Sequence, residues 1–141
     1  GNVFTDFDYM LIDCPPSLSQ STCNAMAMAT TMLVPIQMEG LSVTGVGSIL
    51  EQAKQIRKEL NPNLANMLLL PTMVNSQLVI TNELQDFLEN NFDDSLIPTP
   101  IHRSVKVAEA QTRMTNVIDY APSCRAAEDY MKVAKTIFGE D

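Results

Sequence analysis

The first residues able to do chemistry follow an apolar run near the start of the sequence. Residues 7–12 read FDYMLI and are followed by Asp13, Cys14 and two prolines. This pattern is typical of a strand buried on both faces of a parallel sheet, and proline ends it because proline cannot continue a hydrogen-bonded ladder. We therefore expect Asp13 at the carboxyl edge of the sheet, where ligands bind in open α/β folds. A carboxylate there can hold Mg²⁺ beside nucleotide phosphates, or it can simply cap the following helix.

Strands and helices alternate along the rest of the sequence. Apolar runs predict further strands at residues 32–36, 67–74 and 96–101, the last near a sheet edge because it contains Pro98 and Pro100. Apolar periodicity and capping residues predict helices between these strands. The expected helices cover residues 19–29, 43–60, 80–88, 104–113 and 122–138. Such alternation indicates stacked βαβ units, an α/β fold with a mostly parallel sheet, in which residues 1–141 form one domain.

The composition restricts the class of protein. A chain of 141 residues, 45% apolar and 18% charged, can form one globular domain with its own core. Its three cysteines lack a Cys-x-x-Cys pair, which argues against a disulfide framework or a zinc site, and we expect them to be small core residues in a reducing cytosol. No apolar run reaches the ~20 residues that span a bilayer, and no signal segment begins the sequence. We therefore expect a cytoplasmic protein.

The charge is unevenly distributed. A net charge of −8 argues against nucleic acid as a partner, yet Lys and Arg are absent before Lys54 and again between Lys58 and Arg103. The last third of the chain holds the candidates for DNA contact: Arg103, Lys106, Arg113, Arg125, Lys132 and Lys135. Phosphate contacts need only exposed Lys and Arg. Alternatively, the pairs Arg125–Asp129 and Glu128–Lys132 have the i,i+4 spacing of ion pairs on a helix surface, and such pairs could simply make the helix soluble.

Six short motifs occur in an order that resembles the ParA-type partition ATPases, which carry a deviant Walker A loop. Residues 8–16 match the Walker B pattern DYxLIDCPP, and residues 34–39 match VPIQ-E. The later matches are LNPNL at residues 60–64, LTMxD at 71–75, IPRNVRxSEA at 101–110 and SRGAEAYxxLA at 123–134. The resemblance covers nearly the whole chain and implies a three-layer, P-loop NTPase-like fold with helices on both faces of the sheet.

One part of the family pattern has no counterpart here. The five glycines never form the Gly-x-x-x-x-Gly-Lys-Ser/Thr loop that cradles phosphates, and the family's Walker A lysines are missing as well. The chain thus looks like the carboxyl-terminal part of such an ATPase. Because phosphoryl transfer depends on positioning and on neutralising the γ-phosphate charge, we expect this chain alone not to hydrolyse ATP, whereas its full-length parent does.

The resemblance also implies roles for individual residues. Asp13 becomes the catalytic carboxylate, which binds Mg²⁺ directly or through water. Thr72, Met73 and Asn75 lie where the family contacts the adenine base, and His102 and Arg103 lie in the loop that closes over it. Core packing is the alternative for Met73, and helix capping is the alternative for Asn75, which stands where the family often has Asp. His102 occupies a position usually filled by proline, and we expect neither a catalytic base nor a metal ligand there.

The resemblance further implies partners. The full-length protein would bind ATP and Mg²⁺, form a homodimer, bind DNA without sequence preference and work with a centromere-binding, ParB-like protein on the nucleoid. Gln37 and Glu39 end a strand at the same sheet edge and could reach the nucleotide or the dimer interface, or lie in a solvated loop. A MinD-like ATPase that cycles on membranes is an alternative, but such proteins end in a basic amphipathic helix, whereas residues 138–141 read FGED.

Two further expectations concern the isolated chain. A non-enzymatic α/β module with Asp13 as phosphoacceptor would need a cluster of acids beyond the strand end, whereas Asp6 and Asp8 lie before and within the run. If the phosphate-loop strand normally pairs with the strand ending at Asp13, an apolar edge is exposed in this chain. We therefore expect self-association through that edge, or a stability lower than the chain length suggests.

Overall fold

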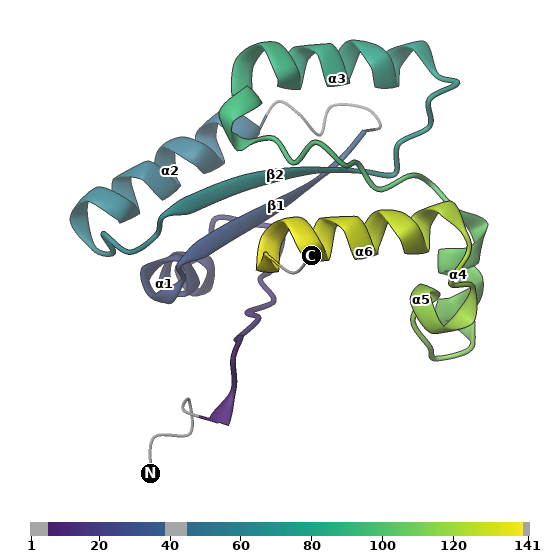
Figure 1. Ribbon diagram of the computed structural model, residues 1–141. Helices are drawn as coiled ribbons and strands as arrows, with labels where there is room; N and C mark the ends of the chain where they lie inside the picture. Colours follow the sequence, from purple (N-terminus) through teal and green to yellow (C-terminus); the bar gives the residue numbers. More distant parts are fainter. Residues whose placement is uncertain (1–5, 39–44, 140–141) are drawn as a thin grey trace.

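The computed structural model of the chain describes residues 6–38 and 45–139. Glu39 and the expected start of a helix at Val43 lie outside these residues. The elements follow one another as α1 (Gln20–Met28), β1 (Thr31–Gln37), α2 (Val46–Glu59), β2 (Asn66–Thr72), α3 (Val79–Phe92), the 3₁₀ turn η2 (Asp93–Ser95), α4 (Val105–Thr112), α5 (Val117–Tyr120) and α6 (Arg125–Phe138). The expected alternation of strands and helices is therefore confirmed from α1 onward (Figure 1).

A parallel pair of strands lies at the centre of the fold. Thr31 of β1 stands opposite Asn66 of β2, and the register continues to Gln37 opposite Thr72. Helix α2 connects the two strands, so β1, α2 and β2 form one βαβ unit. Its connection runs over one face of the sheet, which brings the carboxyl ends of both strands to the same edge.

Residues 96–102 run beside β2 without forming the strand that we expected. They make isolated parallel bridges, Leu69 with Leu96 and Val74 with His102. Backbone hydrogen bonds support the bridges, with the Ile97 N–H donating to the Leu69 carbonyl at 2.9 Å and the Ile101 N–H donating to the Pro71 carbonyl at 2.9 Å. The intervening Pro98 and Pro100 lack N–H groups, which explains why the ladder is interrupted.

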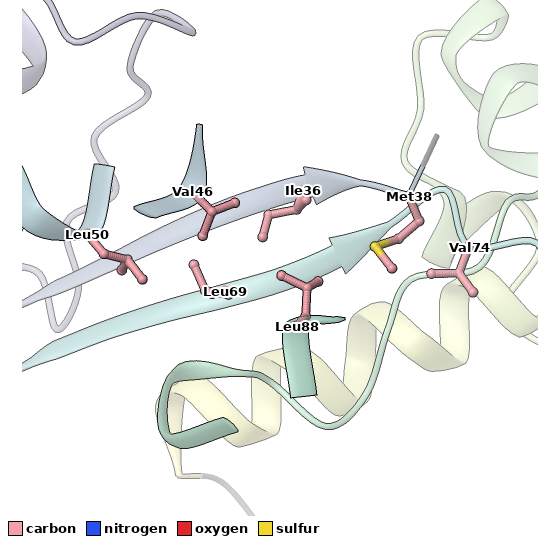
Figure 2. Close-up of a cluster of buried hydrophobic side chains, with 7 residues drawn as sticks. All are labelled: Ile36, Met38, Val46, Leu50, Leu69, Val74 and Leu88. Atoms are coloured by element: carbon pink, nitrogen blue, oxygen red, sulfur yellow. The ribbon is translucent and has the colours of Figure 1, made fainter. Parts of the chain in front are cut away.

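Helices cover both faces of the strands, as expected. On one face, Ile36 and Leu69 pack with residues of α2 and α3 in a cluster of buried side chains that Figure 2 shows. The cluster consists of Ile36, Met38, Val46, Leu50, Leu69, Val74 and Leu88. On the other face, Leu70 packs with Ile97, Ile101 and Val133 of α6. The α/β fold with a parallel sheet between helices is thus confirmed (Figure 1).

Side-chain hydrogen bonds fix the ends of several helices. The Ser19 hydroxyl caps α1 by accepting from the Thr22 N–H, and the Ser104 hydroxyl caps α4 by accepting from the Lys106 N–H. Asn61, which is buried after the end of α2, donates to the carbonyls of Met26 and Ala29 at 2.9 and 2.7 Å. Asn61 therefore joins the carboxyl-terminal end of α1 to that of α2.

The expectation of a buried strand at residues 7–12 is wrong for this structure. The segment has no strand conformation, and its apolar side chains are exposed, with Leu11 at 84%. Figure 1 shows it running away from the strands. It contacts α6, where the Tyr9 and Phe138 rings meet edge to face with their centres 4.5 Å apart. A strand of a parallel sheet needs a hydrogen-bonding neighbour, and among the described residues β1 pairs with β2 alone. Cys14 is consequently exposed and not the core residue we expected.

Within the described residues, no helix is long and apolar enough to cross a bilayer. The described cysteines are free thiols, with Cys23 and Cys124 half-buried. The same part of the chain holds no group of three or more His, Cys, Asp or Glu residues that could bind a metal ion.

Candidate functional site

The carboxyl end of β2 has an unusual backbone. Met73, directly after the strand, has φ = 56°, the left-handed region that residues with a side chain seldom adopt. Its side chain is 44% exposed, whereas that of the next residue, Val74, is buried. The alternative that Met73 is a core residue is therefore wrong, and the strained backbone turns Met73 away from the core.

Asn75 shapes the loop that follows. Its side-chain oxygen accepts from the Gln77 N–H at 3.2 Å, which closes a local turn before α3. The residue that precedes α3 is Leu78, which makes no side-chain cap. Asn75 is thus a turn residue and not the helix cap that we considered.

The loop at residues 101–103 lies against this strand end. The Val74 N–H donates to the Ile101 carbonyl at 3.1 Å, and the Arg103 N–H donates to the Val74 carbonyl at 3.0 Å. The structure therefore brings together, at one edge of the strand pair, the residues that we expected to contact the base. They are Thr72, Met73, Asn75, His102 and Arg103. Gln37, opposite Thr72 at the end of β1, is exposed at the same edge.

A buried acid of α6 that the sequence reasoning missed holds this loop from the other side. The Asp129 Oδ2 atom accepts from the His102 backbone N–H at 3.0 Å and lies 2.8 Å from His102 Nδ1. The Asp129 side chain is only 8% exposed. The reading of Asp129 as a solvated partner of Arg125 is therefore wrong, because its carboxylate points into the fold. A usable signal was its spacing from Ala126 and Val133, both buried on the same face of α6.

The basic residues lie around α4 and α6 and are exposed. Two of them surround Tyr120, with the Arg113 guanidinium 4.8 Å and the Lys106 ammonium 5.9 Å from the ring centre. Lys106 also binds Glu109 at 2.8 Å, and this hydrogen bond raises the pKa of Lys106. The same bond, followed by a second one from the Tyr120 hydroxyl, lowers the pKa of Glu109. Lys106 and Arg113 thus have internal partners on the surface where we expect DNA.

The basic residues of α6 form a second group. Arg125 and Lys132 are about two turns apart and share one face of the helix, and Lys135 lies one turn further on. Arg103 lies at the carboxyl edge of the strand pair and is also exposed. The expected candidates therefore divide into a group near α4 and a group on α6, while Arg103 belongs to the loop that Asp129 holds.

Asp13 is not brought to the edge of the strand pair. It lies in the irregular, exposed segment before α1, where the Ser17 N–H donates to the Pro15 carbonyl at 2.7 Å in a tight turn. A single carboxylate fits Mg²⁺ chemically, because this ion commonly takes one or two carboxylates and completes its shell with water and phosphate oxygens. The donor type therefore suits the ion, while the segment has not taken the strand conformation that we expected to position it.

The fold defines the class of protein. The structure is similar to the P-loop NTPase-like cobyrinic acid a,c-diamide synthase from Mycobacterium smegmatis, with a TM-score of 0.73 and 25% identity over 94% of this chain and 47% of that one. The same enzyme with bound ADP and magnesium matches with a TM-score of 0.62 and 28% identity, over 77% of this chain and 47% of that one. The mixed α/β fold of a P-loop NTPase is thus confirmed.

Comparison with known sequences shows what the chain is similar to. A family model described as an AAA domain matches residues 1–66. The chromosome-partitioning ATPase Soj of Thermus thermophilus is 32% identical over 93% of this chain and 53% of the relative. The chromosome partitioning protein ParA of Caulobacter vibrioides is 30% identical over 96% of this chain and 51% of the relative. The chain is a homologue of the Soj and ParA partition ATPases over most of its length, which confirms the resemblance, and it spans about half the length of these relatives.

Proposed function

We propose that this chain is the carboxyl-terminal part of an Mg²⁺-dependent ATPase that segregates plasmid or chromosomal DNA. The observation that carries the proposal is the sequence similarity to Soj and ParA proteins, which are 32% and 30% identical over 93% and 96% of the chain. The gathering of Thr72, Met73, Asn75, His102 and Arg103 at one sheet edge supports it, because nucleotides bind at this edge of α/β sheets.

Each residue has a defined role in this proposal. Met73, Asn75 and the His102–Arg103 loop bind the adenine end of the nucleotide. Asp13 holds Mg²⁺ once residues 7–12 pair as a strand, and the ion neutralises charge on the phosphates. The binding of ADP with magnesium, and of an ATP analogue with magnesium, by a structural neighbour supports this pair of ligands. Alone, the chain has no phosphate loop and does not hydrolyse ATP.

The proposal includes partners. Arg103, Lys106, Arg113, Arg125, Lys132 and Lys135 contact DNA phosphates in a nucleotide-bound homodimer, and a ParB-like protein regulates the cycle. Exposure of the basic side chains supports the first of these roles. The site of action is the nucleoid in the cytoplasm, with no membrane stage.

A fusion tests the enzymatic part of the proposal. The amino-terminal half of the Thermus thermophilus Soj, placed ahead of this chain, supplies a phosphate loop. We expect Mg²⁺-dependent ATP hydrolysis by the fusion and none by the chain alone. Asp13→Asn in the fusion is expected to reduce kcat by about a hundredfold or more, since one charge-stabilising group is worth that much.

Asp8→Asn is the matched control, because Asp8 is an exposed acid in the same segment. It is expected to leave hydrolysis unchanged. Equal activity of the Asp13→Asn fusion and its parent would remove Asp13 from the site. Hydrolysis by the isolated chain would contradict the claim that a phosphate loop must be supplied.

A further inference from the structure

Asp129 is an unusual residue to find in a core. Among the residues that the structure describes, the buried polar or charged ones are Thr22, Asn61, Thr81 and Asp129, and the last carries the carboxylate. Removing a carboxylate from water is costly unless hydrogen bonds replace the lost solvation. Here His102 supplies them, through its backbone N–H and through ring Nδ1, which carries hydrogen in the tautomer that pairs with a carboxylate.

The backbone geometry explains why an acceptor is needed at this place. The Ile101 N–H donates to Pro71 of β2, and residues 101 and 103 also bond to Val74 just after the strand, so their polar groups face β2 and its carboxyl end. In an extended segment the N–H groups alternate in direction, and the N–H of His102 therefore faces away from β2. It faces α6, where the Asp129 carboxylate accepts it. An unpaired N–H at this buried place would destabilise the fold.

Proline at position 102 would have no N–H and would need no acceptor. In this chain the donor and the acceptor are both present and contact each other directly.

We propose that Asp129 is a positioning residue that ties α6 to the His102–Arg103 loop, so that the loop at the nucleotide edge and helix α6 move as one unit. The role of the loop in binding ATP rests on the proposed function, whereas the tether itself does not. Because α6 also carries Arg125, Lys132 and Lys135, the tether places the base-binding loop and three candidate DNA contacts on one body.

A double-mutant cycle tests the tether in the chain as it stands. Asp129→Ala leaves two donors without an acceptor, and His102→Pro leaves the carboxylate without its donors. Each single change is expected to lower the folding equilibrium constant about 10- to 100-fold in urea unfolding. The double variant removes donors and acceptor together and is expected to fold to within a few-fold of the parent. Additive losses in the double variant would overturn the proposal.

Nuclear magnetic resonance separates positioning from simple stability and covers the case in which His102→Pro fails to fold. Asp129→Ala is expected to speed amide exchange at His102 at least about tenfold and to shift the amide signals of Met73 and Asn75. Asp129→Asn retains an acceptor oxygen and is expected to restore both. Glu128→Ala, at an exposed site on the same helix, is the control and should change neither. Unshifted Met73 and Asn75 signals in Asp129→Ala would overturn the positioning role.

The fusion described above distinguishes this proposal from the proposed function. Asp129→Ala there is expected to raise KM for ATP about tenfold with kcat within about twofold, as for a group that positions a binding loop. An inactive parent fusion that binds no ATP would contradict the proposed function, while the cycle and the exchange data still decide the tether. An active fusion with unchanged KM would overturn the positioning role alone.

Discussion

Two regions of the molecule were both expected to form the nucleotide edge, and they differ sharply. The strand end at residues 72–75 is bridged to residues 101–103, and the β2 residue Leu69 is fully buried. The segment at residues 7–12 is as apolar in sequence, yet Leu11 is 84% exposed. The difference teaches that an apolar run becomes a parallel strand only where another strand pairs with it, since neither its hydrophobicity nor its prolines supply the hydrogen bonds.

The largest effect should separate the two regions directly. Leu69→Ala removes a fully buried side chain from the cluster in Figure 2 and is expected to lower the free energy of unfolding by about 2–5 kcal/mol. Leu11→Ala, its counterpart in the exposed segment, is expected to change it by less than about 0.5 kcal/mol. Urea unfolding measures both. A comparable loss for Leu11→Ala would show that the segment is packed in solution.

The next effect tests a connection within the ordered region. Asn61→Ala removes three side-chain hydrogen bonds, which leaves the carbonyls of Met26 and Ala29 without their donor and the Asn63 N–H without its acceptor. We expect a loss of about 1–3 kcal/mol in the free energy of unfolding. Asn63→Ala is a matched control at an exposed site two residues on. Equal effects of the two changes would mean that the contact between α1 and α2 contributes little.

Self-association tests whether the unpaired edge of β1 is available for contact. Leu33 and Pro35 on β1 are exposed, and no described strand pairs along the other edge of β1. We expect concentration-dependent association in analytical ultracentrifugation, weakened about tenfold by Leu33→Lys, because a charge on an edge strand opposes strand pairing. Gln55→Lys, at an exposed site on α2, adds the same single positive charge elsewhere and should have less effect. A concentration-independent monomer would contradict this expectation.

The smallest effect concerns a surface contact of the ordered region. The hydrogen bond from Lys106 lowers the pKa of Glu109, so the pair stabilises the fold above the ordinary carboxyl pKa of 4.5. That contribution is lost as the pH falls through the lowered pKa. Observing the Glu109 carboxyl by nuclear magnetic resonance should give a titration midpoint below 4.5, and Lys106→Gln should move it upward. An unmoved midpoint would mean that the contact is not populated in solution.

The sequence predicted the elements whose signals are local. The apolar stripe of α2, the runs of β1 and β2, and the caps Ser19 and Ser104 all lie in the expected elements. Helix α5, Val117–Tyr120, was missed because four residues carry too short a period to recognise. The gathering of Met73, Asn75 and the 101–103 loop followed from parallel strands that end at one edge.

Other features of the site depend on contacts between distant parts of the chain. Asp129 has the same spacing from Arg125 as any solvated helical pair, and its place on the buried face of α6 with Ala126 and Val133 was the competing signal. The packing of α6 against the His102 loop decides between the two. The left-handed backbone of Met73 has no local signal either, since methionine is not a residue that favours it. The conformation of residues 7–12 depends on a pairing strand, which a run of apolar letters does not reveal.

Because Cys14 is exposed, chemical labelling of its thiol can report the conformation of the segment before α1. Cys14 adjoins Asp13 and is exposed, whereas Cys23 and Cys124 are half-buried. A thiol reagent added to the folded chain should therefore modify Cys14 first, and mass spectrometry of the digested protein can follow the time course. If a second polypeptide or a fused half orders residues 7–12 into a sheet, alkylation of this sulfur should slow. The alkylation rate of Cys14 would then report when Asp13 reaches a position from which it can contact a bound nucleotide.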